Sequence, residues 1–260
     1  MRLRICGIAI LMLAGFGFAD HDQRPAFRAI VVAEHDMNHS GMVDAATPFL
    51  GRLAEENNFA VDFIENIGRI DDAFLAGYQL FIQLNWTPIG WSQKQQKAFQ
   101  NYIEQGKGWV GLHHAGLTGD RVLRSGQENW TWYENLFFGG AGYADYITPP
   151  VKATVVVEDR DHPAMRNLPA SFEIINDEWY EFDRSPRANV HVLARVDEST
   201  YLPKKPMGDH PVVWSIEKYG RAIYIQMGHD AGVFRNPAFT TLLRDAVLWA
   251  GSGTPRKKAR

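Results

Sequence analysis

GKGWVGLHHAG, residues 106–116, is a glycine-bounded apolar run that ends on two adjacent histidines. Ser92 and Gln95, upstream of it, have the spacing of a capping box, so we expect a helix that begins there and ends at Gly106. Residues 109–112 then have the pattern of a buried strand, and the two histidines follow directly. A helix that leads into a buried strand is half of a βαβ unit.

Buried strands alternate with helices through the first half of the chain. Residues 27–33, 59–64 and 78–84 are further apolar runs, as expected of strands covered on both faces. Between the first two, apolar residues recur at three- and four-residue spacing, which predicts a helix that ends near residues 57–58. The alternation predicts right-handed crossovers and a doubly wound, mostly parallel α/β sheet.

The second half is expected to extend the same sheet. Strand patterns occur at residues 151–157, 190–195, 212–216 and 221–226, and the last two are joined as a late hairpin. Asn236 and Pro237 are suited to the N-cap and first position of a final helix. Residues 128–146, rich in aromatics and glycine, give no clear secondary structure. With no internal repeat and no obvious linker, residues 27–251 are predicted to form one domain.

Composition and the chain ends narrow the possible partners. The net charge of -3, from 27 basic and 30 acidic residues, gives no reason to expect nucleic acid or an anionic membrane as the partner.

Residues 1–19 have the pattern of a cleaved secretory signal, which predicts a periplasmic or secreted protein without a membrane span; an uncleaved anchor is the alternative. The single cysteine, Cys6, lies in this segment, so the mature chain would have no thiol. Residues 252–260 are predicted to be a basic, disordered tail.

Histidines follow three of the predicted strands. His39 lies in the loop after the first strand, His113 ends the opening stretch, and His229 follows the last strand in MGHD. The carboxyl ends of parallel strands gather at one edge, where such sheets bind ligands. With Glu178, which bulky neighbours should partly desolvate, these histidines predict a zinc, manganese or iron site or a metal-free acid–base pair. No nucleotide cofactor is expected.

Other polar and aromatic residues are candidates for binding a small carbohydrate. Asn85 and Trp86 follow the third strand, and Trp179 adjoins the candidate carboxylate. Tryptophan presents an apolar platform suited to the face of a sugar ring, although core packing is the commoner role. His114 is assigned to the same group, and its sequence position leaves open whether it faces the site or the following helix.

Two further histidines are expected to be structural. His162 and His210 each stand in an Asp-His-Pro turn. Proline pre-sets the geometry of such turns, and local hydrogen bonds then account for the histidine.

Four ordered segments resemble the ThuA-like (trehalose-utilisation) family. They are GKGWVGLHHA, the region from DHPAMRNLP to NDEWYEF, HPVVWSIEKYGRAIYIQMGHD, and a terminal helix ending LWAG. The resemblance runs from about residue 27 to residue 251. It implies a flavodoxin-like α/β sandwich similar to the class I glutamine amidotransferases, and a link to sugar metabolism, in particular to oxidised (3-keto) glycosides in bacteria.

The resemblance also bears on the role of the histidines. In the amidotransferases the nucleophilic cysteine occupies a Gly-x-Cys elbow between strand and helix, and the triad histidine follows a late strand. Gly111-Leu112-His113 is similar to the first pattern, with histidine in place of cysteine, and His229 matches the second. Without a thiol the glutamine-derived thioester cannot form, so the amidotransferase reaction is not expected.

The leading hypothesis is an enzyme that acts on a keto-glycoside by metal-assisted or acid–base proton transfer, giving elimination, hydration or isomerisation. His113, His229 and Glu178 would be its catalytic groups and, together with His39, its metal ligands. The alternative is a non-catalytic carbohydrate-binding or partner-binding domain that keeps the fold. A conventional glycosidase with two carboxylates is a third hypothesis.

Overall fold

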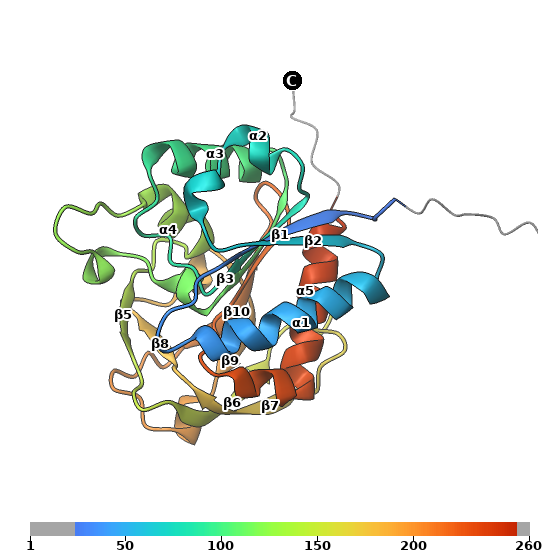
Figure 1. Cartoon of the computed structure of the whole chain (residues 1–260). Coiled ribbons are helices and arrows are strands. Elements are labelled where there is room, and N and C mark those ends of the chain that lie inside the picture. The colour runs from blue at the N-terminus through green and yellow to red at the C-terminus, as the bar shows by residue number, and fades with distance from the viewer. Residues whose placement is uncertain (1–23, 254–260) are drawn as a thin grey trace, which may run out of the picture.

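The computed structural model describes residues 24–253, which fold around a nine-stranded sheet flanked by helices (Figure 1). The predicted signal segment and residues 254–260 of the predicted tail lie outside the described residues. The strand order is β2-β1-β3-β4-β11-β10-β9-β6-β7, and neighbours from β2 to β11 are parallel. These strands are β1 (Arg28–Ala33), β2 (Ala60–Ile64), β3 (Leu80–Leu84), β4 (Gly108–Leu112) and β11 (Ala222–Ile225).

The other half of the sheet is antiparallel. Strand β11 forms the predicted hairpin with β10, and β9, β6 and β7 continue from it. The doubly wound α/β class is confirmed, and its antiparallel part is larger than the late hairpin alone. A separate two-stranded sheet pairs β5 with β8. These strands are β5 (Tyr143–Tyr146), β6 (Val151–Val157), β7 (Ser171–Asp177), β8 (Tyr180–Phe182), β9 (His191–Val196) and β10 (Pro211–Ile216).

Helices cover both faces of the sheet. Helices α1 and α5 pack on one face, and α2, α3 and α4 lie on the other (Figure 1). Their ends match local signals: Ser92 and Gln95 form the predicted capping box, Gly106 has a φ of 84°, and Asn236 caps α5. The helices are α1 (Ser40–Glu56), α2 (Asp72–Leu75), α3 (Gln93–Glu104), α4 (Thr131–Phe137) and α5 (Pro237–Gly251).

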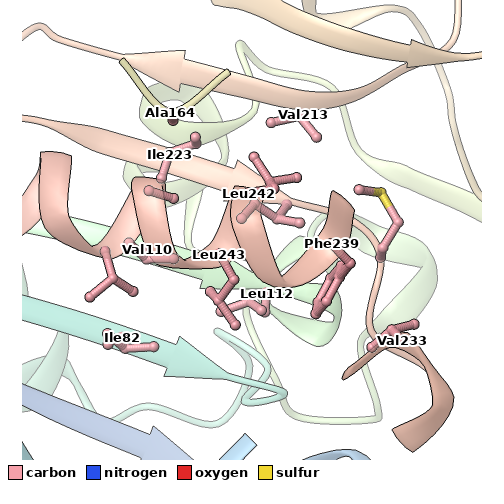
Figure 2. Close-up of a cluster of buried hydrophobic side chains, with 14 of the residues drawn as sticks. Ile82, Val110, Leu112, Ala164, Val213, Ile223, Val233, Phe239, Leu242 and Leu243 are labelled. Carbon is pink, nitrogen blue, oxygen red and sulfur yellow. The ribbon is translucent and has the colours of Figure 1, made fainter. Parts of the chain in front are cut away.

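The sheet separates two hydrophobic cores. In β1, Ala29, Val31 and Ala33 pack on the side of α1 and α5, whereas Ile30 and Val32 face the aromatic core under α3 and α4. This alternation is the two-residue period of a strand buried on both faces. Figure 2 shows the first core, where side chains of α5 pack on β3, β4, β10 and β11. Within residues 24–253, the structure has no helix long and apolar enough to span a membrane.

Candidate metal centre at the strand ends

Four side chains from distant parts of the sequence meet at one edge of the sheet. His39 follows β1, His113 follows β4, Glu178 follows β7 and His229 follows β11. One ligand atom from each lies within 4.8 Å of every other, and the group is buried or half-buried. The four residues predicted as metal ligands are therefore brought together by the fold.

Asp177 accounts for the presence of Glu178 in this group. Strand β7 lies four places from β11 in the sheet order, yet the Asp177 carboxylate at its end accepts hydrogen bonds from the Gly228 N–H at 2.9 Å and the His229 N–H at 3.3 Å. Burial raises the pKa of Asp177 to about 7, against the effect of these N–H donors. Asp177 thus joins the β7–β8 turn to the loop after β11 and sets Glu178 beside His229.

The His39 ring stands at the centre of the cluster. Its Nε2 lies 3.1 Å from Nε2 of His113 and 3.0 Å from Nδ1 of His229. Oε2 of Glu178 lies 3.8, 3.6 and 3.4 Å from the facing nitrogens of His39, His113 and His229. Three nitrogens and one oxygen therefore converge on one small space.

Outer hydrogen bonds fix the tautomers of two of these rings. Nδ1 of His39 lies 2.8 and 2.9 Å from the two Asp36 carboxylate oxygens, and Nδ1 of His113 lies 3.1 Å from the Gln226 carbonyl oxygen. Since these oxygens only accept, each Nδ1 carries the hydrogen, and each neutral ring presents an Nε2 lone pair. When both rings are neutral, two lone pairs thus face each other across 3.1 Å.

This arrangement fits a divalent metal ion. Donors bound to one ion at about 2.1 Å must lie roughly 3.0–3.4 Å apart. The two nitrogen separations of 3.0 and 3.1 Å fall in this range, and Oε2 of Glu178 lies slightly farther, at 3.4–3.8 Å from the three nitrogens. A proton on His39 Nε2 can serve only one of the facing acceptors at a time, whereas a cation serves all four donor atoms. Imidazole nitrogen with one carboxylate suits zinc, manganese or iron.

The electrostatics of the cluster are those of a cation site. Burial raises the pKa of Glu178, but hydrogen bonds from the three imidazoles outweigh it and hold that pKa well below its ordinary value. Burial lowers the pKa of His113. For Asp36, donors from Asn38, His39 and Asn85 outweigh burial and lower the pKa to about 2. Two carboxylates are therefore ionised among imidazoles, one within the cluster and one behind it.

His113 occupies a strained elbow. Its φ of 47° is in the left-handed region, which non-glycine residues seldom adopt, and such strain concentrates at functional sites. Two glycines close to this elbow leave no room for a side chain. A Cβ at Gly111 would collide with the Trp109 ring, and one at Gly228 would lie 2.8 Å from Cε of Met42 and 3.4 Å from Cβ of His113. The turn after β4 thus holds the His113 imidazole at the edge of the cluster.

A cavity of about 680 Å³ opens beside the cluster. His39, Glu178 and His114 line it, so His114 faces the site rather than a helix. Sequence analysis missed Tyr180, which also lines it and whose hydroxyl lies 2.9 Å from Nε2 of His113. The sequence did hold a signal for Tyr180. It lies two residues after Glu178 in NDEWYE, and side chains two apart in an extended segment point to the same side.

The other three residues predicted to bind substrate do not line this cavity. Asn85 is fully buried, and its side-chain N–H donates to the Glu34 carbonyl at 3.1 Å and to Asp36 at 2.9 Å. Trp179 is also fully buried and donates its indole N–H to the Val151 carbonyl. Trp86 packs against the aromatic core. The expected sugar contacts are thus replaced by a positioning role for Asn85 and packing roles for the two tryptophans.

His162 and His210 lie apart from the cluster and have local partners. Nδ1 of His162 accepts from the Ala164 N–H at 3.2 Å. His210 is fully buried, with Nε2 2.8 Å from the Tyr180 carbonyl and Nδ1 2.9 Å from Glu198. These contacts agree with the predicted structural roles, and His210 additionally supports the strand that carries Tyr180.

Comparison with known proteins shows where this architecture occurs. A family model described as trehalose utilisation, ThuA, matches residues 28–250. A putative ThuA-like protein from Bacteroides uniformis is 31% identical, with a TM-score of 0.78 over 91% of this chain and 95% of that one. A second, from Parabacteroides merdae, is 20% identical, with a TM-score of 0.64 over 90% of this chain and 93% of that one.

More distant structures share only the fold. A β-galactosidase from Bacillus circulans sp. alkalophilus is 15% identical, with a TM-score of 0.54 over 88% of this chain and 32% of that one. No curated protein matches the sequence. The family match covers nearly every described residue and includes all four members of the cluster, and the Bacteroides uniformis structure agrees with it at full length. The chain therefore belongs to the ThuA (trehalose utilisation) family.

Proposed function

We propose that this protein is a metal-dependent enzyme that transfers protons on a carbohydrate, with a keto-glycoside as the substrate class. The observation that carries the proposal is the pair of Nε2 atoms of His39 and His113, which face each other at 3.1 Å while both Nδ1 atoms face oxygen acceptors. A divalent cation resolves this arrangement. His39, His113, His229 and Glu178 would hold it.

A zinc, manganese or iron ion bound there would polarise a carbonyl or hydroxyl oxygen of the substrate. Tyr180 also lines the cavity, with its hydroxyl 2.9 Å from Nε2 of His113, and could donate a hydrogen bond to that oxygen. His114, at the cavity wall, is the proton acceptor in this proposal. Burial holds the pKa of His114 well below its ordinary value, so its imidazole is unprotonated near pH 7 and can accept a proton, although it is a weaker base than an exposed histidine.

Two observations support a carbohydrate as substrate. The family to which the chain belongs is described by trehalose utilisation. The part of the cavity next to the cluster is lined by Glu34, Asp36 and His114, which supply acceptors for hydroxyl groups. A periplasmic or secreted location is part of the proposal and rests only on the sequence of residues 1–19.

Metal analysis of untagged protein, purified without chelator, tests the proposal. Wild type is compared with His113→Asn and His229→Ala; asparagine is chosen at position 113 because it tolerates a positive φ. His191→Ala is the matched control, since this exposed histidine lies on β9 and pairs with Asp159. We expect about one zinc, manganese or iron ion per chain in wild type and control, and about a tenth of that or less in the two cluster variants.

Equal metal content in all four proteins would contradict the ligand assignment. Absence of metal from wild type, even after supplementation with zinc, manganese and iron, would also contradict it. A metal-free acid–base enzyme or a plain carbohydrate-binding domain would then be the better account of the cluster.

A further inference from the structure

The cavity beside the cluster has two chemically different sides. Residues that directly follow β1, β4 and β7 make one side polar and acidic; they are Glu34, Asp36, His39, His114 and Glu178. Loops farther along the chain make the other side mainly aliphatic and aromatic, with Ile89, Leu117, Val122, Tyr143 and Tyr146; Thr87, Arg124 and Gln127 line the cavity from the same loops. A volume of about 680 Å³ is large for one hexose, so a ligand held at the cluster would extend along this second side.

The apolar side is a fixed part of the fold. The Tyr143 N–H donates to the Thr118 carbonyl at 2.9 Å, and the Thr118 hydroxyl donates to the Ala141 carbonyl at 3.3 Å. These bonds join β5 to the loop that carries Leu117. The loop with Ile89 lies beside the loop with Gln127, since a Cβ at Gly90 would lie 3.9 Å from Nε2 of Gln127, and both residues line the cavity. The three segments thus form a wall without any bound ligand.

The aliphatic part of this wall is suited to an apolar group rather than to a second sugar. Ile89, Leu117 and Val122 are each only half-buried, so a ligand could remove further apolar surface from water. Their aliphatic side chains offer no hydrogen bond to hydroxyl groups. Oε1 of the adjacent Gln127 accepts from the Arg124 N–H at 2.7 Å and is therefore engaged.

A further apolar side chain lies at the exposed rim of the cavity. Met37, four residues after β1 ends and two before His39, also lines the cavity and is 97% exposed. A methionine at such exposure contributes nothing to the core, and its flexible thioether adapts to apolar surfaces of different shape.

We infer that the ligand of this cavity is a glycoside with an apolar, aryl-type aglycone: the sugar lies against the acidic side at the cluster, and the aglycone lies against Ile89, Leu117, Val122 and the two tyrosines. The sugar's place rests on the proposed function. The aglycone's place rests on the wall itself.

Binding calorimetry with two pairs of probes tests this inference on the full-length protein. The probes are phenyl and methyl glucosides, each in the α and β configuration, so that the two members of a pair differ only in the aglycone. We expect the phenyl member of at least one pair to bind about tenfold tighter or more. In Leu117→Asn and Val122→Thr this ratio should fall toward one, while affinity for the methyl glucoside is kept.

Leu202→Asn is the control for adding a polar group, because Leu202 is 88% exposed and does not line the cavity. Equal affinity for phenyl and methyl glucosides, or no binding of any phenyl glucoside at 10 mM, would overturn the inference, as would a preference unchanged in both wall variants. Metal content, measured on the same samples, tests the proposed function separately. A metal-loaded protein without aryl preference refutes only the inference, and an aryl preference without metal refutes only the proposed function.

Discussion

His39 uses its two ring nitrogens for opposite purposes. Nδ1 faces the Asp36 carboxylate at 2.8 and 2.9 Å, and Nε2 faces the other members of the cluster. Burial lowers the pKa of His39, but the carboxylates of Glu178 and Asp36 outweigh it and raise that pKa. A ring held in this way is oriented before any ion arrives, which limits the entropy lost on binding.

Asp36→Asn should therefore weaken metal binding about 10- to 100-fold without removing a ligand. The amide keeps the shape but loses the charge that holds the His39 Nδ1–H. Competition with a chromophoric chelator measures the affinity. Asp44→Asn is the control, because Asp44 is exposed on α1 and contacts only His35 in this region. Unchanged affinity in Asp36→Asn would contradict the assignment of His39 as an oriented ligand.

His162 should make folding stability depend on pH. Burial lowers its pKa to about 4, whereas in the unfolded chain it titrates near 6.5. Below about 6.5 the unfolded state binds a proton that the folded state does not, so the free energy of unfolding falls as pH falls, until about pH 4. His162→Asn keeps a turn acceptor and removes the titration.

Urea denaturation at pH 7.5 and pH 5 measures this contribution. Between these values wild type should lose about 2 kcal/mol more than His162→Asn, since each pKa unit corresponds to about 1.4 kcal/mol. The same loss in both proteins would show that His162 does not set the acid sensitivity.

At the scale of elements, two glycines illustrate opposite requirements. Gly51 lies inside α1, where a Cβ would meet nothing within 4 Å. Gly51→Ala should raise the free energy of unfolding by about 0.5–1 kcal/mol, because alanine loses less backbone entropy in a helix. Urea denaturation measures this change, and the m-value should stay the same. A lower stability would show that a Cβ at position 51 meets neighbouring atoms after all.

Gly111, in β4, should behave in the opposite way. A Cβ there collides with the Trp109 ring, so Gly111→Ala should lower the free energy of unfolding by about 1–3 kcal/mol through overpacking. Gly111 lies two residues before His113 on the same strand end, so metal affinity should fall as well. Denaturation and chelator competition on one sample test both effects, and a neutral substitution would contradict the close packing.

Local signals explain which elements could be predicted from sequence. The ends of α3 and α5 depend on caps a few residues away, and the parallel strands on continuous apolar runs, so both were found. Strands β5, β7 and β8 were not. The alternation of buried Phe172 and Ile174 with exposed neighbours was present in β7, but it is weak at a sheet edge. Strand β8 has only three residues, too few for a recognisable pattern, and it forms because it pairs with β5.

At the scale of the whole molecule, the cluster could be anticipated because parallel strands end at one edge. That rule places His39, His113 and His229 together. It does not place Glu178, whose position depends on Asp177 bonding to the loop after β11 from a strand at the far side of the sheet. The burial of Asn85 and Trp179 likewise depends on side-chain directions that sequence spacing cannot supply.

Metal should stabilise the whole fold, because its ligands come from segments that are far apart along the chain. At a free metal concentration 100 times the dissociation constant, the gain is about 2.7 kcal/mol, or roughly 5–10 °C in Tm for a domain of this size. Calorimetry with added metal and with chelator measures the shift. The shift should disappear in His113→Asn; an equal shift in that variant would point to binding elsewhere.

The place of β11 has a consequence for biosynthesis. This strand, late in the sequence, lies between β4 and β10, near the middle of the sheet, and carries His229 at its end. While the ribosome is still extending the chain, the earlier parallel strands have an open edge and the cluster lacks both His229 and the loop that holds Asp177. If the cluster binds a metal ion, as proposed, the ion can be bound only after translation has passed β11, and a prematurely terminated product would have no assembled site.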